Sequence, residues 1–112
     1  MIRIERHPLV RYDLRELARH VADVSGDPHA AERRLDQVDD LLADILKNPN
    51  SGALLSDTLP GWRVRHGGVG RRITIVFRLS EANDCLQFAL VAFGGQNWMD
   101  TVPERSLSFK QG

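Results

Sequence analysis

The chain has 112 residues, with equal numbers of acidic and basic side chains and 42% hydrophobic residues. This length fits one domain, residues 1–112, since a domain of this size buries roughly two-thirds of the surface of its unfolded chain. The single cysteine, Cys85, excludes an intrachain disulfide and suits a reducing cytoplasm. No apolar run approaches the roughly 20 residues of a membrane helix, and the N-terminus lacks the apolar region of a signal peptide. We therefore expect one cytoplasmic domain without a membrane partner.

Charge is unevenly distributed although the total is zero. Residues 1–59 carry 8 basic and 11 acidic residues, a balance of −3, whereas residues 60–112 carry 7 and 4, a balance of +3. The stretch 60–80 holds five arginines and no acidic residue. Arg presents a planar fork that grips phosphates and carboxylates with two hydrogen bonds. The neutral total therefore does not exclude an anionic partner, because the second half of the chain is basic.

In chain order, the first predicted elements are a short strand and a helix. Residues 2–5 alternate between apolar and charged, which is the period of a half-buried strand. Apolar residues then recur at helical spacing over 8–25, with Pro8 expected at the first helical position. A later start is the alternative, since Asp13 and Glu16 have the spacing of a capping box. The apolar stripe consists of Val10, Leu14, Leu17, Val21 and Val24.

A second helix is predicted from Pro28 to about Lys47. Gly26 suits the left-handed position that ends a helix, and Asp27 suits the cap of the next one. So short a turn between two helices implies an antiparallel hairpin. The stripe of the second helix consists of Ala31, Leu35, Val38, Leu42 and Ile45, widened by Leu41 and Leu46.

After residue 52 the apolar period changes to that of strands. The runs 62–65, 72–79 and 85–93 are separated by two turns, one of them rich in glycine, and the last run is expected to form a central strand. The fold class is therefore α+β: an N-terminal strand, a helical hairpin and a three-stranded antiparallel meander, with both helices on one face of the sheet. For the tail after Gly94, a short helix and a last strand remain alternatives.

Arginines in the meander form the main candidate site. Arg63 and Arg65 lie two apart on one strand and share a face. Arg72 and Arg78, six apart, are expected to share a face too, with Arg71 in the turn between the strands. Pairing of the two strands would bring several guanidinium groups together to hold phosphates or an acidic peptide, unless a one-residue shift in register turns one pair away. The alternative is that the arginines solvate an uncovered sheet face.

Other chemistry-bearing residues are isolated. The four histidines lack metal-ligand spacing, so we expect no metal and no cofactor. His66 is a candidate base, with an exposed turn residue as the alternative. Cys85 is expected to be a small buried hydrophobe. Trp98 is interpreted either as a lid on the core or as an exposed anchor for a partner.

Short motifs follow one another along nearly the whole chain. They are Asp13-Leu14-Arg15-Glu16-Leu17, Ala30-Ala31-Glu32-Arg33-Arg34-Leu35, Asn48-Pro49, Leu59-Pro60-Gly61-Trp62-Arg63, Ile75-Val76-Phe77-Arg78-Leu79, Leu90-Val91-Ala92-Phe93 and Gln96-Asn97-Trp98. In this order they resemble the RelE/ParE superfamily of toxins from type II toxin–antitoxin modules. Gly94-Gly95 departs from that pattern, since many members have a His and a basic residue there.

The resemblance implies a growth-inhibiting toxin that a cognate antitoxin neutralises, in a toxin–antitoxin heterotetramer that serves plasmid stabilisation. RelE-like members cleave messenger RNA on the ribosome with Lys and Arg on the sheet and often a Tyr or His after the last strand. ParE-like members inhibit DNA gyrase and are not nucleases. Here no Lys lies between 48 and 109, the only Tyr is Tyr12, and no His follows His66. The sequence therefore favours the ParE-like branch.

Three functions remain open at this point. A gyrase inhibitor would bind its target or its antitoxin through Arg63, Arg65, Arg71, Arg72, Arg78 and Trp98. A ribosome-dependent endoribonuclease would instead use Arg63, Arg65, Arg72 and Arg78 as catalytic residues. A third hypothesis is a relic that binds its antitoxin and has lost toxicity.

Overall fold

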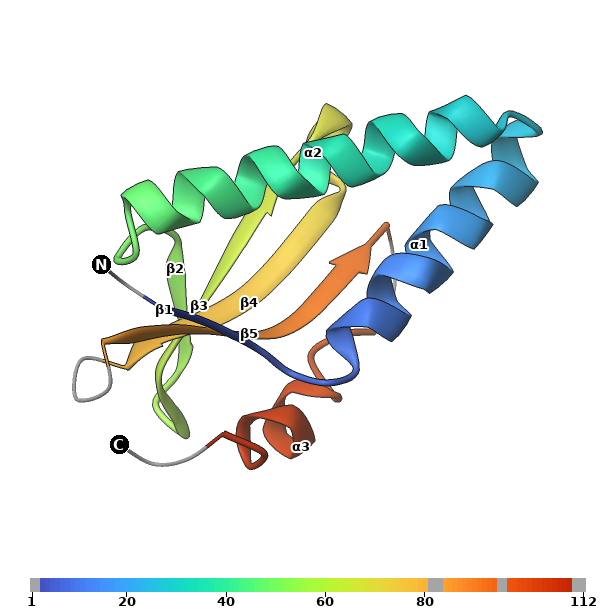
Figure 1. Cartoon of the computed structure of the whole chain (residues 1–112). Coiled ribbons are helices and arrows are strands. Elements are labelled where there is room, and N and C mark those ends of the chain that lie inside the picture. The colour runs from blue at the N-terminus through green and yellow to red at the C-terminus, as the bar shows by residue number, and fades with distance from the viewer. Residues whose placement is uncertain (1–2, 81–83, 95–96, 110–112) are drawn as a thin grey trace.

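A computed structural model describes residues 3–80, 84–94 and 97–109 (Figure 1). Ile2, most of the predicted turn after 80 and Gln96 lie outside the described residues. The elements are β1 (Arg3–Arg6), α1 (Val10–Ser25), α2 (Pro28–Lys47), β2 (Ala53–Ser56), β3 (Leu59–Gly67), the 3₁₀ turn η1 (Val69–Arg71), β4 (Ile73–Ser80), β5 (Cys85–Phe93) and α3 (Val102–Ser106).

The strands form a five-stranded sheet in the order β1-β5-β4-β3-β2. β1 lies at one edge, parallel to β5, and the remaining neighbours are antiparallel. The α+β class, the meander and the interior place of β5 are thus confirmed. The meander has one strand more than predicted, since Ala53–Ser56 forms the outer strand β2. The sequence does not predict this strand, because its four residues, which are mostly exposed in the structure, carry no alternating pattern.

Both long helices cover the same face of the sheet, as expected (Figure 1). The core between them and the strands consists of Val10, Leu17, Val38, Leu41, Ile45, Ile73, Ile75, Phe77, Leu86, Phe88 and Val91. α1 begins at Val10, two residues later than predicted, because His7 occupies the preceding turn. The Val10 N–H donates to the His7 carbonyl at 2.9 Å and the Leu9 N–H donates to His7 Nδ1 at 3.0 Å.

The turn of the helical hairpin has the predicted capping chemistry. Gly26 takes the left-handed conformation, with φ of 69°, and its N–H donates to the Ala22 carbonyl. The Asp27 carboxylate accepts a hydrogen bond from the His29 N–H at 2.9 Å, while Pro28 opens α2. The two helices diverge from the sheet towards this turn, so the tip of the hairpin extends beyond the strands (Figure 1).

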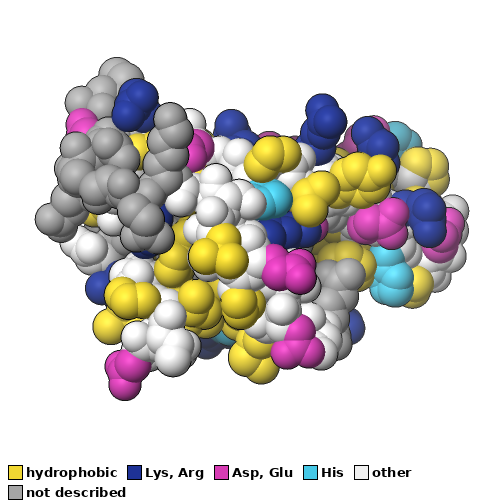
Figure 2. Space-filling view, turned by 90° about the horizontal axis from the view of Figure 1, so that it is seen from below, with side chains coloured by type: hydrophobic (Ala, Val, Ile, Leu, Met, Phe, Trp, Pro, Cys, Tyr) yellow, Lys and Arg dark blue, Asp and Glu magenta, His cyan; other side chains and the backbone are white. Residues whose placement is uncertain are grey.

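The opposite face of the sheet is covered by the C-terminal segment, which forms the short helix α3 rather than a last strand. Its smaller core consists of Trp62, Val76, Ala89, Leu90, Val102 and Phe109, with Trp98 packed against it. Figure 2 shows this side of the molecule, with hydrophobic side chains gathered near its centre. The half-buried place of Trp98 agrees with its interpretation as a lid on the core.

Candidate functional site

Two of the predicted arginines project from β3 towards the helices. Arg63 pairs in register with Phe77 and Arg65 with Ile75, and both of these partners belong to the core beneath the helices. Arg65 Nη2 lies 3.9 Å from an Asp44 carboxylate oxygen on α2. Arg63 Nη1 donates to the Gly52 carbonyl at 3.5 Å. These two side chains therefore connect β3 to α2 and to the segment that leads into β2.

Arg78 lies on the other face of the sheet. Its guanidinium carbon stands 4.7 Å from the centre of the Trp62 ring, and Nε and Nη2 donate to Gln87 Oε1 at 3.0 and 2.7 Å. Burial lowers the pKa of Arg78 from its ordinary value, against the opposing effect of Glu5. The predicted convergence of the arginines is therefore wrong. The register sets Arg78 opposite Trp62, whereas Arg63 is opposite Phe77, so the two arginines point to different faces.

The last two predicted arginines lie in the turn between β3 and β4. Arg71 is exposed, with φ of 56°. Arg72 follows η1 and lines a pocket on the helix side, so it does not share a face with Arg78 as predicted. The alternation rule fails for this pair because Arg72 precedes the first residue of β4 and has helical backbone angles.

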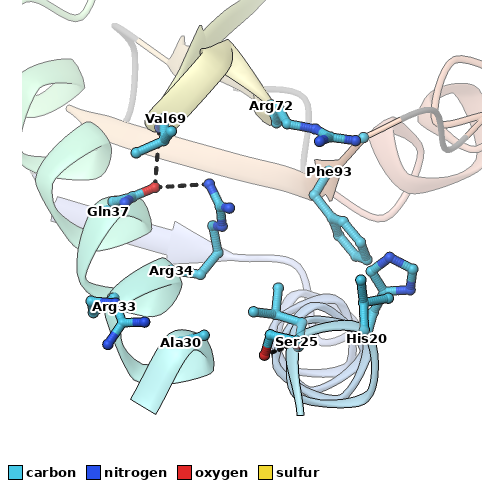
Figure 3. A pocket seen from close by; sticks show the side chains of 12 residues that line it. His20, Ser25, Ala30, Arg33, Arg34, Gln37, Val69, Arg72 and Phe93 are labelled. Carbon is cyan, nitrogen blue, oxygen red and sulfur yellow. Dashed lines mark hydrogen bonds between the residues drawn. The ribbon is translucent and has the colours of Figure 1, made fainter. Parts of the chain in front are cut away.

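This pocket, which we call the basic pocket, has a volume of about 690 Å³. It lies between the tip of the helical hairpin, the turn before β4 and the end of β5 (Figure 3). Its cationic lining comprises Arg33, Arg34 and Arg72, His20 also lines it, and none of the described residues that line it is Asp or Glu. No pattern in the sequence marks Arg33 and Arg34 as site residues, since only the fold brings α2 next to the turn before β4.

Gln37 organises one wall of the basic pocket. Its Oε1 accepts hydrogen bonds from Arg34 Nη1 at 3.0 Å and from the Val69 N–H at 3.2 Å (Figure 3). A Cβ on Gly68, where φ is +75°, would lie 2.9 Å from this oxygen and 2.7 Å from Ile73 Cδ1. Glycine is therefore required for the turn to approach α2 so closely.

A smaller pocket of about 330 Å³ lies between α1, β5 and α3 and includes Trp98. The Trp98 ring lies 6.4 Å from the ring of His66, centre to centre. His66 is exposed, and its Nδ1 is within hydrogen-bond distance of the Thr74 hydroxyl, at 2.9 Å. Because neighbouring residues of a strand point to opposite faces, His66 and Arg65 do not form a joint site.

Cys85 is buried, as expected, with 2% of its surface exposed. Burial, followed by the charge of Glu5, raises the pKa of the thiol, so it stays protonated at neutral pH. A protonated, buried thiol is a poor nucleophile. Within the described part of the chain, no group of three or more His, Cys, Asp or Glu is placed to hold a metal ion.

The comparisons with known proteins agree with this architecture. Residues 4–98 match the family described as the ParE toxin of the type II toxin–antitoxin system parDE. No individual curated protein matches the chain. In the described part of the structure, no helix has both the length and the apolar character needed to cross a membrane.

The chain belongs to the ParE toxin family, because the match covers most of its length. It is the toxin component of a type II toxin–antitoxin system, and the family implies an antitoxin as its partner.

Proposed function

We propose that this toxin inhibits growth by binding DNA gyrase, without catalysis of its own. The observation that carries the proposal is the separation of the sheet arginines. Arg63 and Arg65 point to the helix face, whereas Arg78 packs on Trp62 at the other face. An endoribonuclease must gather cations around one scissile phosphate and place an acid or base within hydrogen-bond reach of it. This distribution of the arginines favours a binding protein over a nuclease.

The remaining contacts of these arginines also favour structural roles. Arg65 Nη2 lies 3.9 Å from an Asp44 carboxylate oxygen, and Arg65 Nη1 donates to the Ser51 hydroxyl at 3.3 Å. Arg78 donates to Gln87 Oε1. The candidate base His66 faces Trp98 and Thr74, away from Arg65. A cleavage reaction at these side chains would require most of these contacts to break first.

The members of the predicted set whose side chains take no part in these hydrogen bonds and ion pairs are then the candidate target contacts. Arg71 and Arg72 are exposed and Trp98 is half-buried. We propose that these three residues contact gyrase, and that the antitoxin neutralises the toxin in the cytoplasm within a toxin–antitoxin heterotetramer. A role in plasmid stabilisation belongs to the same proposal.

Pulse labelling tests the proposal in cells. The chain is induced in bacteria without an antitoxin, and incorporation of labelled thymidine and labelled methionine is followed over the first minutes. We expect DNA synthesis to fall first, and co-expression of the antitoxin to restore it. An earlier fall in methionine incorporation would overturn the proposal in favour of an endoribonuclease. If neither falls, the chain is a relic that has lost toxicity.

A further inference from the structure

The basic pocket has the size and the position of a small-molecule site. Its volume of about 690 Å³ falls within the range of roughly 300–1,000 Å³ that is typical of ligand pockets. Four separate segments line it: the end of α1, the start of α2, the turn before β4 and the end of β5. The pocket forms because the hairpin tip extends past the sheet and leaves a hollow against the last residues of β5 (Figures 1 and 3).

The positive charge of the pocket is largely uncompensated. Arg33 is the one lining arginine with an ion pair among the described residues, at 3.4 Å from an Asp27 carboxylate oxygen. Arg34 is half-buried and donates to the neutral amide of Gln37. Arg72 follows the turn on the other side of the hollow (Figure 3). A Cβ on Gly94 would lie 3.8 Å from Arg72 Nη2. Two guanidinium groups on opposite walls, with no carboxylate between them, favour an anionic ligand.

The rest of the wall is apolar and partly aromatic. Val21, Val24 and Phe93 line it, and the His20 ring packs on Phe93 with 4.8 Å between the ring centres. Val24 ends the apolar stripe of α1, yet it is 74% exposed. An anion without an apolar body would leave this wall in contact with water. A flat ring would cover it by stacking and by hydrophobic contact.

We propose that the basic pocket binds a phosphate monoester attached to a flat ring, as in a mononucleotide. A phosphate fits better than a carboxylate because it carries up to two charges and three acceptor oxygens, so it can accept from Arg34 and Arg72 at the same time. The ring lies against Phe93 and His20. Gln37 is a positioning residue, since its Oε1 holds the Arg34 guanidinium and the turn before β4 in place.

Calorimetric titration of the purified full chain tests this proposal. The probes are adenosine monophosphate, adenosine and inorganic phosphate, measured at low salt. We expect adenosine monophosphate to bind at least about tenfold more tightly than either fragment, because each fragment lacks one of the two interactions. Backbone amide signals of Val69 and Gly94 shift in nuclear magnetic resonance spectra when the pocket fills.

Matched variants locate the binding site. Arg34→Gln and Arg72→Gln should each weaken binding of adenosine monophosphate about tenfold, since each removes a charge-assisted hydrogen bond. Arg11→Gln removes the same charge from an exposed residue of α1 outside the pocket and should change binding less than twofold. Circular dichroism of each variant establishes that it is folded.

Several outcomes would overturn the proposal. If all three variants bind adenosine monophosphate equally weakly, the effect is one of overall charge and not of the pocket. If adenosine binds as tightly as adenosine monophosphate, the phosphate has no role in binding. Binding of a short acidic peptide but not of adenosine monophosphate would assign the pocket to a protein segment. One outcome would instead support the proposal and refine it. If a 5′-phosphorylated dinucleotide binds more tightly than the mononucleotide, the pocket still recognises a phosphate and a ring, and its ligand is the end of a nucleic-acid strand. The proposal does not rest on the gyrase target.

Discussion

Asp13 and Arg105, 92 residues apart in the chain, form a two-pronged ion pair between α1 and α3, with oxygen–nitrogen distances of 2.5 and 2.8 Å. Their side chains are only 11% and 10% exposed. The carboxylate of Asp13 also accepts the Val91 N–H, and the guanidinium of Arg105 donates to the Ala89 carbonyl, both at 3.0 Å. Ala89 is the extra residue of a bulge in β5, since Val76 pairs with Leu90 and Phe77 with Phe88. The ion pair therefore connects α1, α3 and β5 at the bulge of β5.

Removal of one member of this pair should destabilise the fold strongly. Arg105→Met leaves the Asp13 carboxylate buried without its cation, and we expect the free energy of unfolding to fall by about 3 kcal/mol or more. The double variant Asp13→Leu with Arg105→Met should recover part of this loss, because no charge then remains buried. Urea unfolding measures both values.

An exposed ion pair on the same helix is the control for that experiment. Glu16 and Arg19 lie 3.8 Å apart with side chains 50% and 71% exposed. Glu16→Gln should change the free energy of unfolding by less than about 0.5 kcal/mol. A comparable loss in both variants would contradict the special role of the buried pair.

His7 should make stability depend on pH. Burial and then the positive charge of Arg105 lower its pKa from the ordinary value of 6.5, against the opposing effect of Asp13. The unfolded chain therefore binds the proton more readily than the folded one. The contribution of His7 is fully present above about pH 6.5 and is lost as the pH falls below that value. Protonation also removes the hydrogen bond that Nδ1 accepts from the Leu9 N–H.

Urea unfolding at pH 7.5 and 5.5 measures this dependence. His7→Gln should make the difference in stability between the two pH values smaller. The control is His29→Gln, at a side chain that is 77% exposed. This variant should show the same difference in stability between pH 7.5 and 5.5 as the original chain. A pH dependence that survives His7→Gln would show that other groups cause it.

Two glycines with similar backbone angles should respond differently to the same substitution. Gly26 has φ of +69° with nothing near its would-be Cβ, whereas at Gly52, with φ of +84°, a Cβ would lie 2.4 Å from the Val64 carbonyl oxygen. In both alanine variants the left-handed backbone is strained, which should lower the free energy of unfolding by about 1 kcal/mol. Gly52→Ala should lower the free energy of unfolding clearly more than Gly26→Ala, because its new Cβ clashes with the backbone of Val64. Equal midpoints of thermal unfolding for the two variants would contradict the close approach of this segment to β3.

Arg78 should contribute to stability rather than to ligand binding. Arg78→Met leaves Oε1 of the buried Gln87 without its two hydrogen bonds and removes the cation from the Trp62 ring. We expect a loss of about 1–3 kcal/mol in the free energy of unfolding and no change in binding at the basic pocket. Arg71→Met, at an exposed residue of the turn, should be nearly neutral. A neutral Arg78→Met would leave this arginine available for a functional role.

The elements that depend on local pattern could be predicted from the sequence. The apolar stripes and the Gly26-Asp27-Pro28 turn predicted the helical hairpin closely, since capping is decided by neighbouring residues. β2 could not be predicted in this way, because pairing with β3 forms it and its residues carry no alternating pattern.

The site was less predictable because register and tertiary contacts decide it. Which face Arg63 and Arg78 take depends on their partners across β3 and β4, and no spacing within one strand contains that information. The spacing around Asp13 indicates a capping box and a family motif but not an ion pair, because its partner, Arg105, lies in α3. Arg34 and Arg72 meet at one pocket only because the hairpin tip extends past the sheet.

We propose that this ParE-family toxin acts on gyrase by binding rather than on messenger RNA by cleavage. The most direct measurement adds the purified chain to two reactions side by side: supercoiling of relaxed plasmid by gyrase, and translation of a reporter messenger RNA by purified ribosomes. We expect supercoiling to stop while the messenger RNA stays intact and translation continues. Cleaved messenger RNA with gyrase fully active would contradict it.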